Sequence, residues 1–312
     1  MQADAADRST RRTIDAAAVS HALRRLAAAP APPWLHGEVA CRMAERLAVV
    51  KLQPPRVLDW WSHLGASHES LAAAYPKARQ TRVEPDAGLA VRSQAALAAP
   101  AGAGWSPSAL IARWSRPAID IALESELPAG HGQLVWANMM LHASTDPGQT
   151  MRQWHRALAP DGFLMFSTLG PGSLAGLRTL YADAGWPPPH APFVDMHDLG
   201  DMLLHAGFAD PVMDQELLTL TWATPEALIA ELRGLGANAD PQRTAGLRTP
   251  RWRQGLHRAL ESLRGPDGRL RLVFEIVYGH AFRPPPRPKL AGVTAVPLAD
   301  MRAMVRAGRG SL

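Results

Sequence analysis

The sequence has one cysteine, Cys41, and no apolar stretch near the roughly 20 residues that a membrane-spanning helix needs. A single cysteine excludes an internal disulfide and a cysteine-rich metal site. The polar N-terminus lacks the apolar core of a secretion signal, so we expect a soluble, cytoplasmic protein. There is no HExxH motif and no carboxylate–histidine cluster, and we expect no metal site. Cys41 lies in a helical pattern, where a small buried residue is the simplest interpretation.

The formal net charge of +5 comes from one end of the chain. Residues 283–312 hold six of the 33 basic residues and one of the 28 acidic ones, which accounts for the whole excess. The rest of the chain is neutral, which argues against a nucleic-acid partner. The basic tail opens with a proline-rich run and has few aromatic residues, so we expect it to be disordered.

The first half of the chain alternates between short buried strands and helices after two N-terminal helical segments. The two segments, 14–29 and 37–50, are separated by a proline-rich loop. The elements that follow are predicted at 57–59, 69–78, 80–84 and 89–98. Such alternation is typical of a parallel sheet with helices on both faces. Two short strands, 109–114 and 118–123, are both compatible with the next segment, and the pattern does not separate them.

The second half continues with strands and then with helices that have clear starts. Strands are predicted at 133–138, 163–168, 212–222 and 268–278, and helices at 149–158, 173–185 and 196–206. The run Pro160-Asp161-Gly162 is a strong turn signal. Thr224-Pro225 and Thr249-Pro250 each combine an N-cap residue with a first-turn proline, which predicts two further helices.

Three stretches carry the most specific information: WLHGEVACRMAERL; VWANMMLHAS with MRQWHRALAPDGFLMFSTLGPGSL; and the closing module of ALIAELRGLGANA, GLRTPRW and LRLVFEIVYGHAF. Over roughly residues 14–282 they resemble the malonyl-acyl-carrier-protein O-methyltransferases of biotin synthesis. That family is a branch of the class I S-adenosylmethionine (SAM) dependent methyltransferases. The third stretch separates this branch from generic methyltransferases.

The resemblance implies an α/β, Rossmann-like class I methyltransferase fold with a mainly parallel seven-stranded sheet. The last two strands, 212–222 and 270–280, would form an antiparallel hairpin, and residues 172–206 and 224–264 a helical lid over the acceptor site. The expected organisation is N-terminal helices (1–50), a SAM-binding core (51–170), lid helices with the last two strands (171–282), and the basic tail (283–312).

The loop after the first strand departs from the family pattern and forms a degenerate motif. The family places an acid and a glycine-rich loop there, because the backbone passes close to the cofactor, often at positive φ. In the run VLDWWSHLG, Asp59 and Gly65 match, whereas Trp61 and His63 stand at glycine positions. An indole at this point either turns away and leaves a remodelled SAM pocket, or fills a vacant pocket as a core side chain.

Three further residues are candidates for binding SAM. Glu84 would accept hydrogen bonds from the ribose hydroxyls, for which a carboxylate is suited. Asn138 would face the methionine end or the acceptor, and Asp120 is the nearest acid for the adenine. An ordinary strand-end glutamate and a turn-forming asparagine are the structural alternatives.

The implied reaction moves a methyl group to a carboxylate that is already anionic at pH 7, so it requires positioning rather than a strong base. Ser167, Thr168 and Ser173 are candidates for holding the acceptor. His142 and Arg233 are the candidates for a catalytic role. Arg233 could pair the acceptor carboxylate or a phosphopantetheine phosphate.

An acyl-carrier protein is the partner that the resemblance implies, and such proteins are acidic, so a docking surface should be basic. Residues 233–264 contain seven arginines against two acids; they are Arg233, Arg243, Arg248, Arg251, Arg253, Arg258 and Arg264. A solvated arginine-rich helix would give the same pattern.

Two main functions remain open at this point, besides a methyltransferase that acts on another small acceptor. The first is a SAM-dependent methyltransferase acting on the free carboxylate of malonyl-acyl-carrier protein in biotin precursor synthesis. The second is a catalytically inactive protein with the same fold that acts as a binding or regulatory partner. A nicotinamide dehydrogenase is disfavoured, because no GxGxxG motif follows the first strand.

Overall fold

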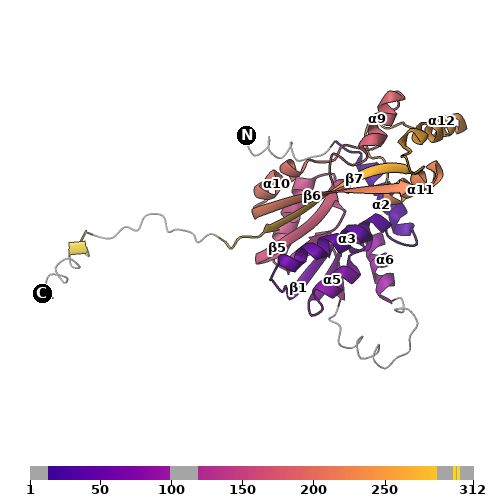
Figure 1. Cartoon of the computed structure of the whole chain (residues 1–312). Coiled ribbons are helices and arrows are strands. Elements are labelled where there is room, and N and C mark those ends of the chain that lie inside the picture. Colours follow the sequence, from indigo (N-terminus) through magenta and orange to yellow (C-terminus); the bar gives the residue numbers. More distant parts are fainter. Residues whose placement is uncertain (1–12, 99–118, 287–297, 300, 303–312) are drawn as a thin grey trace.

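The computed structural model describes residues 13–98, 119–286, 298–299 and 301–302. A central sheet is covered by helices on both faces (Figure 1). The strands are β1 (Arg56–Trp60), β2 (Arg79–Glu84), β3 (Ile119–Leu123), β4 (Gly132–Ala137), β5 (Leu158–Leu169), β6 (Ala209–Trp222) and β7 (Leu270–Phe282). The helices are α2 (Ala16–Ala28), α3 (Trp34–Arg46), α4 (Ser62–Gly65), α5 (His68–Ala74), α6 (Ala87–Ala98), α8 (Pro147–Ala157), α9 (Ala175–Asp183), α10 (Met196–His205), α11 (Pro225–Leu235) and α12 (Pro250–Leu260).

The seven strands have the order β3-β2-β1-β4-β5-β7-β6. Strands β1 to β5 are parallel, and β7 is antiparallel to both of its neighbours, β5 and β6. The mainly parallel sheet and the closing hairpin are therefore confirmed. The chain leaves β1 toward β2 on one side and later returns to place β4 on the other side. Open α/β sheets bind ligands at such a switch point, beside the carboxyl ends of the strands.

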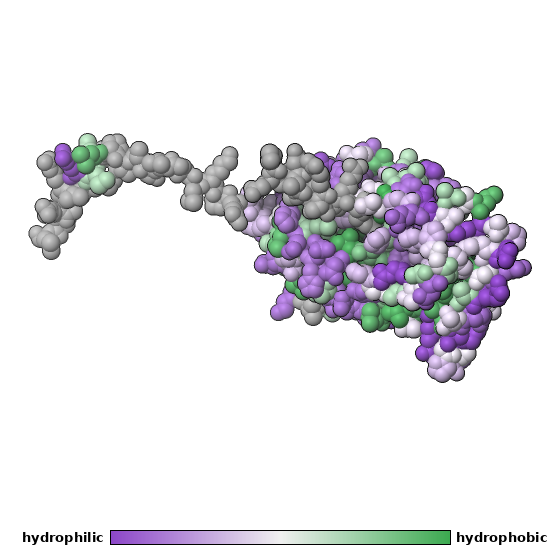
Figure 2. Space-filling model, turned by 90° about the horizontal axis from the view of Figure 1, so that it is seen from above, coloured by the Kyte–Doolittle hydropathy of each residue, from purple (hydrophilic) through white to green (hydrophobic). Residues whose placement is uncertain are grey.

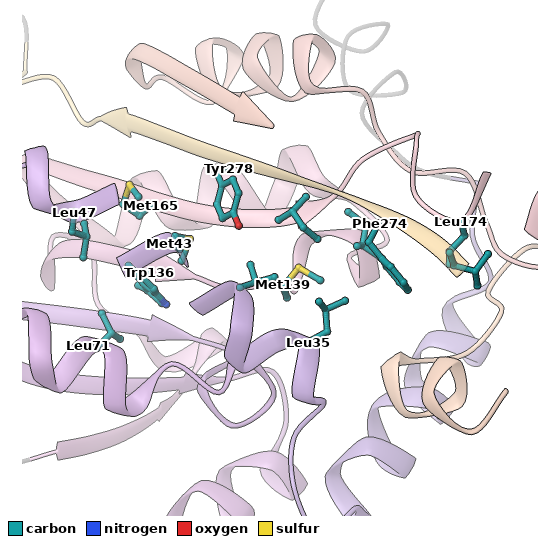
Figure 3. Close-up of a cluster of buried hydrophobic side chains, with 14 of the residues drawn as sticks. Leu35, Met43, Leu47, Leu71, Trp136, Met139, Met165, Leu174, Phe274 and Tyr278 are labelled. Carbon is teal, nitrogen blue, oxygen red and sulfur yellow. The ribbon is translucent and has the colours of Figure 1, made fainter. Parts of the chain in front are cut away.

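Alternate residues of the central strands enter two separate cores. In β4, Leu134 and Trp136 pack into one core, and Val135 and Ala137 pack into the other. Strands of a parallel sheet read as continuous apolar runs because both faces are buried. Figure 3 shows the first core, which runs from Leu47 past Trp136 to Phe274.

The helices divide between the two faces of the sheet. The first core receives apolar side chains from α3, α5, α9, α11 and α12, and the second from α2, α4, α6, α8 and α10. Figure 1 shows α9, α11 and α12 gathered beyond one end of the sheet. Helix α10, in the segment expected to form part of the lid, instead packs against α8 and β6, because Leu199 and Leu203 are buried there.

The predicted helix starts are confirmed by their capping bonds. Thr224 Oγ1 accepts a hydrogen bond from Ala227 N (3.3 Å), and Thr249 Oγ1 accepts one from Trp252 N (3.1 Å). In both helices a proline occupies the first turn, where no backbone donor is lost. The Thr-Pro signal therefore fixes the starts of α11 and α12.

The Pro160-Asp161-Gly162 run lies within β5 rather than before it. Asp161 adopts φ +62°, and the register between β4 and β5 shifts opposite this point. The backbone of Arg283 exchanges hydrogen bonds with Asp161 and Gly162 (3.0 and 2.8 Å), so the run behaves as a bulge paired to β7. Arg283, assigned to the basic tail from the sequence, is thus held against the sheet.

One expectation for the N-terminal helices is wrong. Cys41 is exposed on α3, because Leu35, Val39 and Met43 form the buried face of that helix. Of the two candidate strands before residue 124, the second is β3, while residues 109–114 lie outside the described part, as does most of the tail. No helix within the described ranges is long and apolar enough to cross a membrane.

Gly279 provides a test of how tightly β7 is inserted between its neighbours. A Cβ atom at this position would lie 2.0 Å from Cε1 of Phe166, a buried ring of the second core. Gly279→Ala should lower the free energy of unfolding by about 1–3 kcal/mol, as overpacking does. Gly234→Ala is the matched control: its Cβ would meet nothing within 4 Å, and it should not destabilise α11. Equal denaturation midpoints for the two variants would contradict the described packing.

Candidate functional site

Strained loops mark the carboxyl ends of the parallel strands. Trp61, Met139 and Leu174 follow β1, β4 and β5, and all three have left-handed backbone angles (φ +53°, +50° and +57°). Such angles are uncommon for residues with a side chain and concentrate at functional sites. All three residues also line one cavity, which is described below. This edge of the sheet is therefore the candidate site.

Trp61 keeps the backbone conformation that glycine usually supplies. Its φ and ψ are +53° and +48°, which costs a side-chain-bearing residue roughly 1–2 kcal/mol. Trp61 N donates to Val83 O at 2.7 Å, which ties the loop to the neighbouring strand. The loop thus follows the left-handed path expected for the family, although an indole replaces the hydrogen atom of glycine.

Two buried carboxylates lie beside this loop, at the ends of β1 and β2. Asp59 accepts a hydrogen bond from Ser62 Oγ, and Glu84 Oε1 accepts from His63 N (2.9 Å) and from Ser93 Oγ. The remaining oxygens, Asp59 Oδ1 and Glu84 Oε2, are buried and have no hydrogen-bond partner among the described residues. The sequence placed both acids correctly at strand ends, and the structure brings them together.

Burial raises the pKa values of both carboxyl groups. Desolvation raises the pKa of Asp59 to about 6, against a lowering by the hydrogen bond from Ser62 and the charge of Arg82. Desolvation raises the pKa of Glu84 to about 7, although Ser93 and His63 donate to it. Above these pKa values the two groups are ionised, and their unpartnered oxygens are then acceptors that have no donor among the described residues.

Asp120 and Glu124 occupy opposite ends of β3. Asp120 pairs in register with Thr81 near the beginning of β2 and forms an ion pair with Arg79 (2.9 Å). The structure therefore does not bring Asp120 to the site. Glu124 follows the last residue of β3, and its Oε1 accepts from the indole nitrogens of Trp60 (2.6 Å) and Trp61 (2.5 Å). Sequence reasoning missed Glu124, although an acid directly after a strand was the available signal.

Asn138 connects four segments through its fully buried side chain. Its Nδ2 donates to His36 O (2.7 Å) and Gly65 O (2.6 Å), and its Oδ1 accepts from Ser167 Oγ (2.7 Å). The end of β4 is thereby fixed to α3, to the loop after β1 and to β5. Gly65 takes part through its carbonyl, while Met139 N donates back to Ser167 Oγ at 3.0 Å.

The three hydroxyl residues expected at the acceptor do not line the cavity. Ser167 belongs to the Asn138 network, and Thr168 is buried within β5. Ser173 Oγ donates to Glu275 O and accepts from Glu275 N, both at 3.0 Å, so it ties the loop after β5 to β7. These three residues therefore hold the strands and loops around the site in place and do not contact the cavity.

A cavity of about 460 Å³ lies between this edge and the helices beyond the end of the sheet, and its lining is mainly apolar. Its walls come from α2, α9, α11 and α12 and from the loops after β1 and β4. His142 and Arg233, the two candidates for a catalytic role, both line it, as do Arg25 and Arg248. Arg25 Nη2 donates to Arg233 O (2.7 Å) and to Gly236 O, which joins α2 to the end of α11.

Two histidine rings meet in the cavity wall. His142 makes edge-to-face contacts with His36 and with Phe193 (ring centroids 6.4 and 6.2 Å apart). His36 Nδ1 donates to Leu64 O at 2.7 Å, and burial lowers the pKa of His36 to about 4, so this ring is neutral. His36 is a further site residue that the sequence did not single out, because its role depends on contacts with Leu64 and Asn138.

Comparisons with known proteins identify the family. A family model described as a methyltransferase domain matches residues 40–210. The chain is 39% identical over 258 residues to a malonyl-[acyl-carrier protein] O-methyltransferase of Laribacter hongkongensis, which covers 82% of this chain and 84% of that protein. The chain belongs to the malonyl-[acyl-carrier protein] O-methyltransferase family. A relative of the same name from Gallionella capsiferriformans is 35% identical over 285 residues, with 91% and 96% coverage.

Solved structures agree with this family's fold. The YcgJ protein of Bacillus subtilis aligns with a TM-score of 0.50 over 78% of this chain and 98% of its own, at 10% identity. At that identity the likeness shows the fold alone. Within the malonyl-[acyl-carrier protein] O-methyltransferase family the relatives are named as enzymes, and the catalytically inactive alternative finds no support.

The methyl donor of a class I methyltransferase is SAM, and the polar atoms at this edge suit it. The ribose hydroxyls and the amino group of SAM are hydrogen-bond donors, and Asp59 Oδ1 and Glu84 Oε2 are buried oxygens to which no residue in the described part of the chain donates. These atoms would hold the donor in a malonyl-[acyl-carrier protein] O-methyltransferase. Neither carboxylate lines the cavity, however, and Trp61 is the residue of the loop 59–63 that does.

The raised pKa of Glu84 makes stability depend on pH. The carboxyl group of Glu84 stays protonated to a higher pH in the folded chain than in the unfolded chain. The free energy of unfolding should therefore fall as pH rises from about 4.5 to about 7. Glu84→Gln keeps an oxygen that can accept from His63 and Ser93 but cannot ionise. The decrease in the free energy of unfolding over this pH range should therefore be smaller in the variant than in the wild type, by on the order of 2 kcal/mol. Urea unfolding of both proteins from pH 5 to 8 measures it. Glu126→Gln, at an exposed position, is the control, and parallel curves for wild type and Glu84→Gln would contradict the described burial.

Proposed function

We propose that this protein transfers the methyl group of SAM to the free carboxylate of malonyl-acyl-carrier protein. The observation that carries the proposal is the similarity of 35–39% over most of the chain to relatives with that named activity. The cavity between the strand ends and the lid helices supports the proposal, because the acceptor could bind there next to the candidate donor site. A methyl ester of the malonyl thioester would be the product.

The chemistry asks for orientation and for exclusion of water. When bound, SAM supplies a methyl group activated by the sulfonium centre. The acceptor carboxylate is ionised at neutral pH, so this chain need not remove a proton from it. The apolar walls of the cavity, among them Leu169, Phe193 and Phe274, exclude water and leave the attacking oxygen poorly solvated.

Arginines are the groups that would hold the anionic acceptor. Arg25, Arg233 and Arg248 line the cavity, and their guanidinium groups suit a carboxylate or a phosphate. Arg248 lies over the ring of Trp252, with its Cζ 4.0 Å from the ring centroid, which orients it at the wall. We assign the recognition of the acceptor to these side chains and the shaping of the wall to His142.

A basic surface on α11 and α12 would receive the carrier protein. Of the seven arginines in residues 233–264, Arg243 pairs with Asp15 (2.6 Å) and Arg264 pairs with Glu261 (2.6 Å). The other five make no ion pair with a described residue. Helix α12 lies at the right-hand end of the molecule in Figures 1 and 2, where hydrophilic residues predominate. Uncompensated arginines on this surface complement an acidic partner.

The test uses the purified chain, SAM, and malonyl-acyl-carrier protein or malonyl-coenzyme A, with mass spectrometry of the methyl ester. Methylation of the carrier-bound malonyl group is expected, with a higher kcat/KM than for the free thioester. Methylation of another acceptor with none of malonyl-acyl-carrier protein would replace the substrate in this proposal.

Charge reversal separates docking from chemistry. Arg253→Glu, on α12, should lower kcat/KM for malonyl-acyl-carrier protein about three- to tenfold at low salt and leave the coenzyme A thioester unaffected. Arg56→Glu is the control, because Arg56 is exposed at the beginning of β1, the opposite edge of the sheet. An equal loss in both arginine variants would argue against docking on α12.

A further inference from the structure

Trp61 lines the cavity and belongs to the loop beside Asp59 and Glu84, two carboxylates that each have one oxygen without a donor among the described residues. Its side chain borders the cavity, whereas Asp59 and Glu84, which flank the same loop, do not reach it. The indole is 7% exposed and packs in the second core with Trp60 and Leu64. A ligand in the cavity therefore meets Trp61 where the family would present a glycine.

The hydrogen bond that holds the indole of Trp61 is one of two that a single oxygen of Glu124 accepts. Glu124 Oε1 accepts from Trp60 Nε1 at 2.6 Å and from Trp61 Nε1 at 2.5 Å. If the Trp61 indole left, Glu124 would keep its bond to Trp60, so no buried charge would lose its only partner. Trp60 is fully buried, whereas Trp61 has an open cavity of about 460 Å³ beside it. Trp61 is thus the indole that has both the room and the freedom to turn.

Two buried carboxylates beside the loop of Trp61 favour rotation of its indole when a suitable ligand binds. Asp59 Oδ1 and Glu84 Oε2 are buried acceptors that no described residue satisfies. Unsatisfied buried acceptors destabilise a fold, and donors from a ligand would relieve that cost.

We propose that the indole of Trp61 is a gate that closes the donor site in the free protein and turns away from Glu124 when the nucleoside end of the methyl donor enters. The inference rests on the proposed function for the identity of that ligand. Trp61 then sets the affinity for the donor, because binding requires an open form that is a minority in the free protein. A glycine at this position would leave the polar oxygens open at all times.

The experiment is titration calorimetry of the full chain with S-adenosylhomocysteine, the demethylated donor. If the closed form holds about 90% of the free protein, Trp61→Gly lowers Kd about tenfold. Trp61→Phe keeps a ring but loses the bond to Glu124, and should give an intermediate Kd. Trp60→Phe is the matched control: it removes the other indole donor to Glu124 without opening the cavity wall, and should give no gain in affinity.

A second measurement on the unaltered sequence keeps the test independent of how the variants fold. In protein labelled with 5-fluorotryptophan, the ¹⁹F resonance of Trp61, assigned by its absence in Trp61→Phe, should shift on adding S-adenosylhomocysteine. An unmoved resonance together with equal Kd values for wild type and Trp61→Gly would overturn the gate and leave the proposed methyltransferase function intact. Absence of binding in every folded variant would overturn the gate, and absence of methyl transfer would separately overturn the function.

Discussion

The side-chain amide of Asn138 is the interaction on which the site depends. At the point where the strand order reverses, one buried group joins the end of β4 to α3 through His36, to the first loop through Gly65, and to β5 through Ser167. Both donors and the acceptor are used, so the amide has no freedom to rotate. The two histidine rings, the left-handed loop and the wall of the cavity are all positioned from these anchors.

The loop after β1 shows how a family can keep a backbone while changing the side chains on it. Trp61 retains the positive φ that glycine normally provides, and its bond to Val83 keeps the loop beside β2. The strain of that conformation is offset by the packing of a large aromatic ring in the second core. Asp59 and Glu84 lie at the ends of β1 and β2 beside this loop, and each keeps one buried oxygen without a donor among the described residues. Membership of the family and a covered donor site are compatible, provided that the ring can move.

Periodicity predicted most of the fold, because it reports which residues are buried. The alternation of strands and helices followed from it, whereas the starts of α11 and α12 followed from the Thr-Pro signals. The pattern placed Asp59 and Glu84 at strand ends, and the resemblance to the family gave them a role with the cofactor. It could not show which end of β3 faces the site. The sequence therefore predicted Asp120, near the beginning of β3, whereas the acid at the carboxyl end is Glu124. Nor could it show that the polar atoms of Asn138 and Ser173 form hydrogen bonds within the protein and are not directed to a ligand. Such assignments depend on contacts between residues far apart in the chain, which a local pattern does not contain.

Amide hydrogen exchange of Asn138→Ala, compared with the wild type, tests the central role of this side chain. The account predicts that protection falls together in residues 34–40 and 59–66, the two segments whose carbonyl groups lose the Asn138 donor, while β5 and β7 keep their protection. Unchanged protection in both segments would contradict the claim, as would a uniform loss across the sheet, because neither result is expected if one amide joins these segments locally.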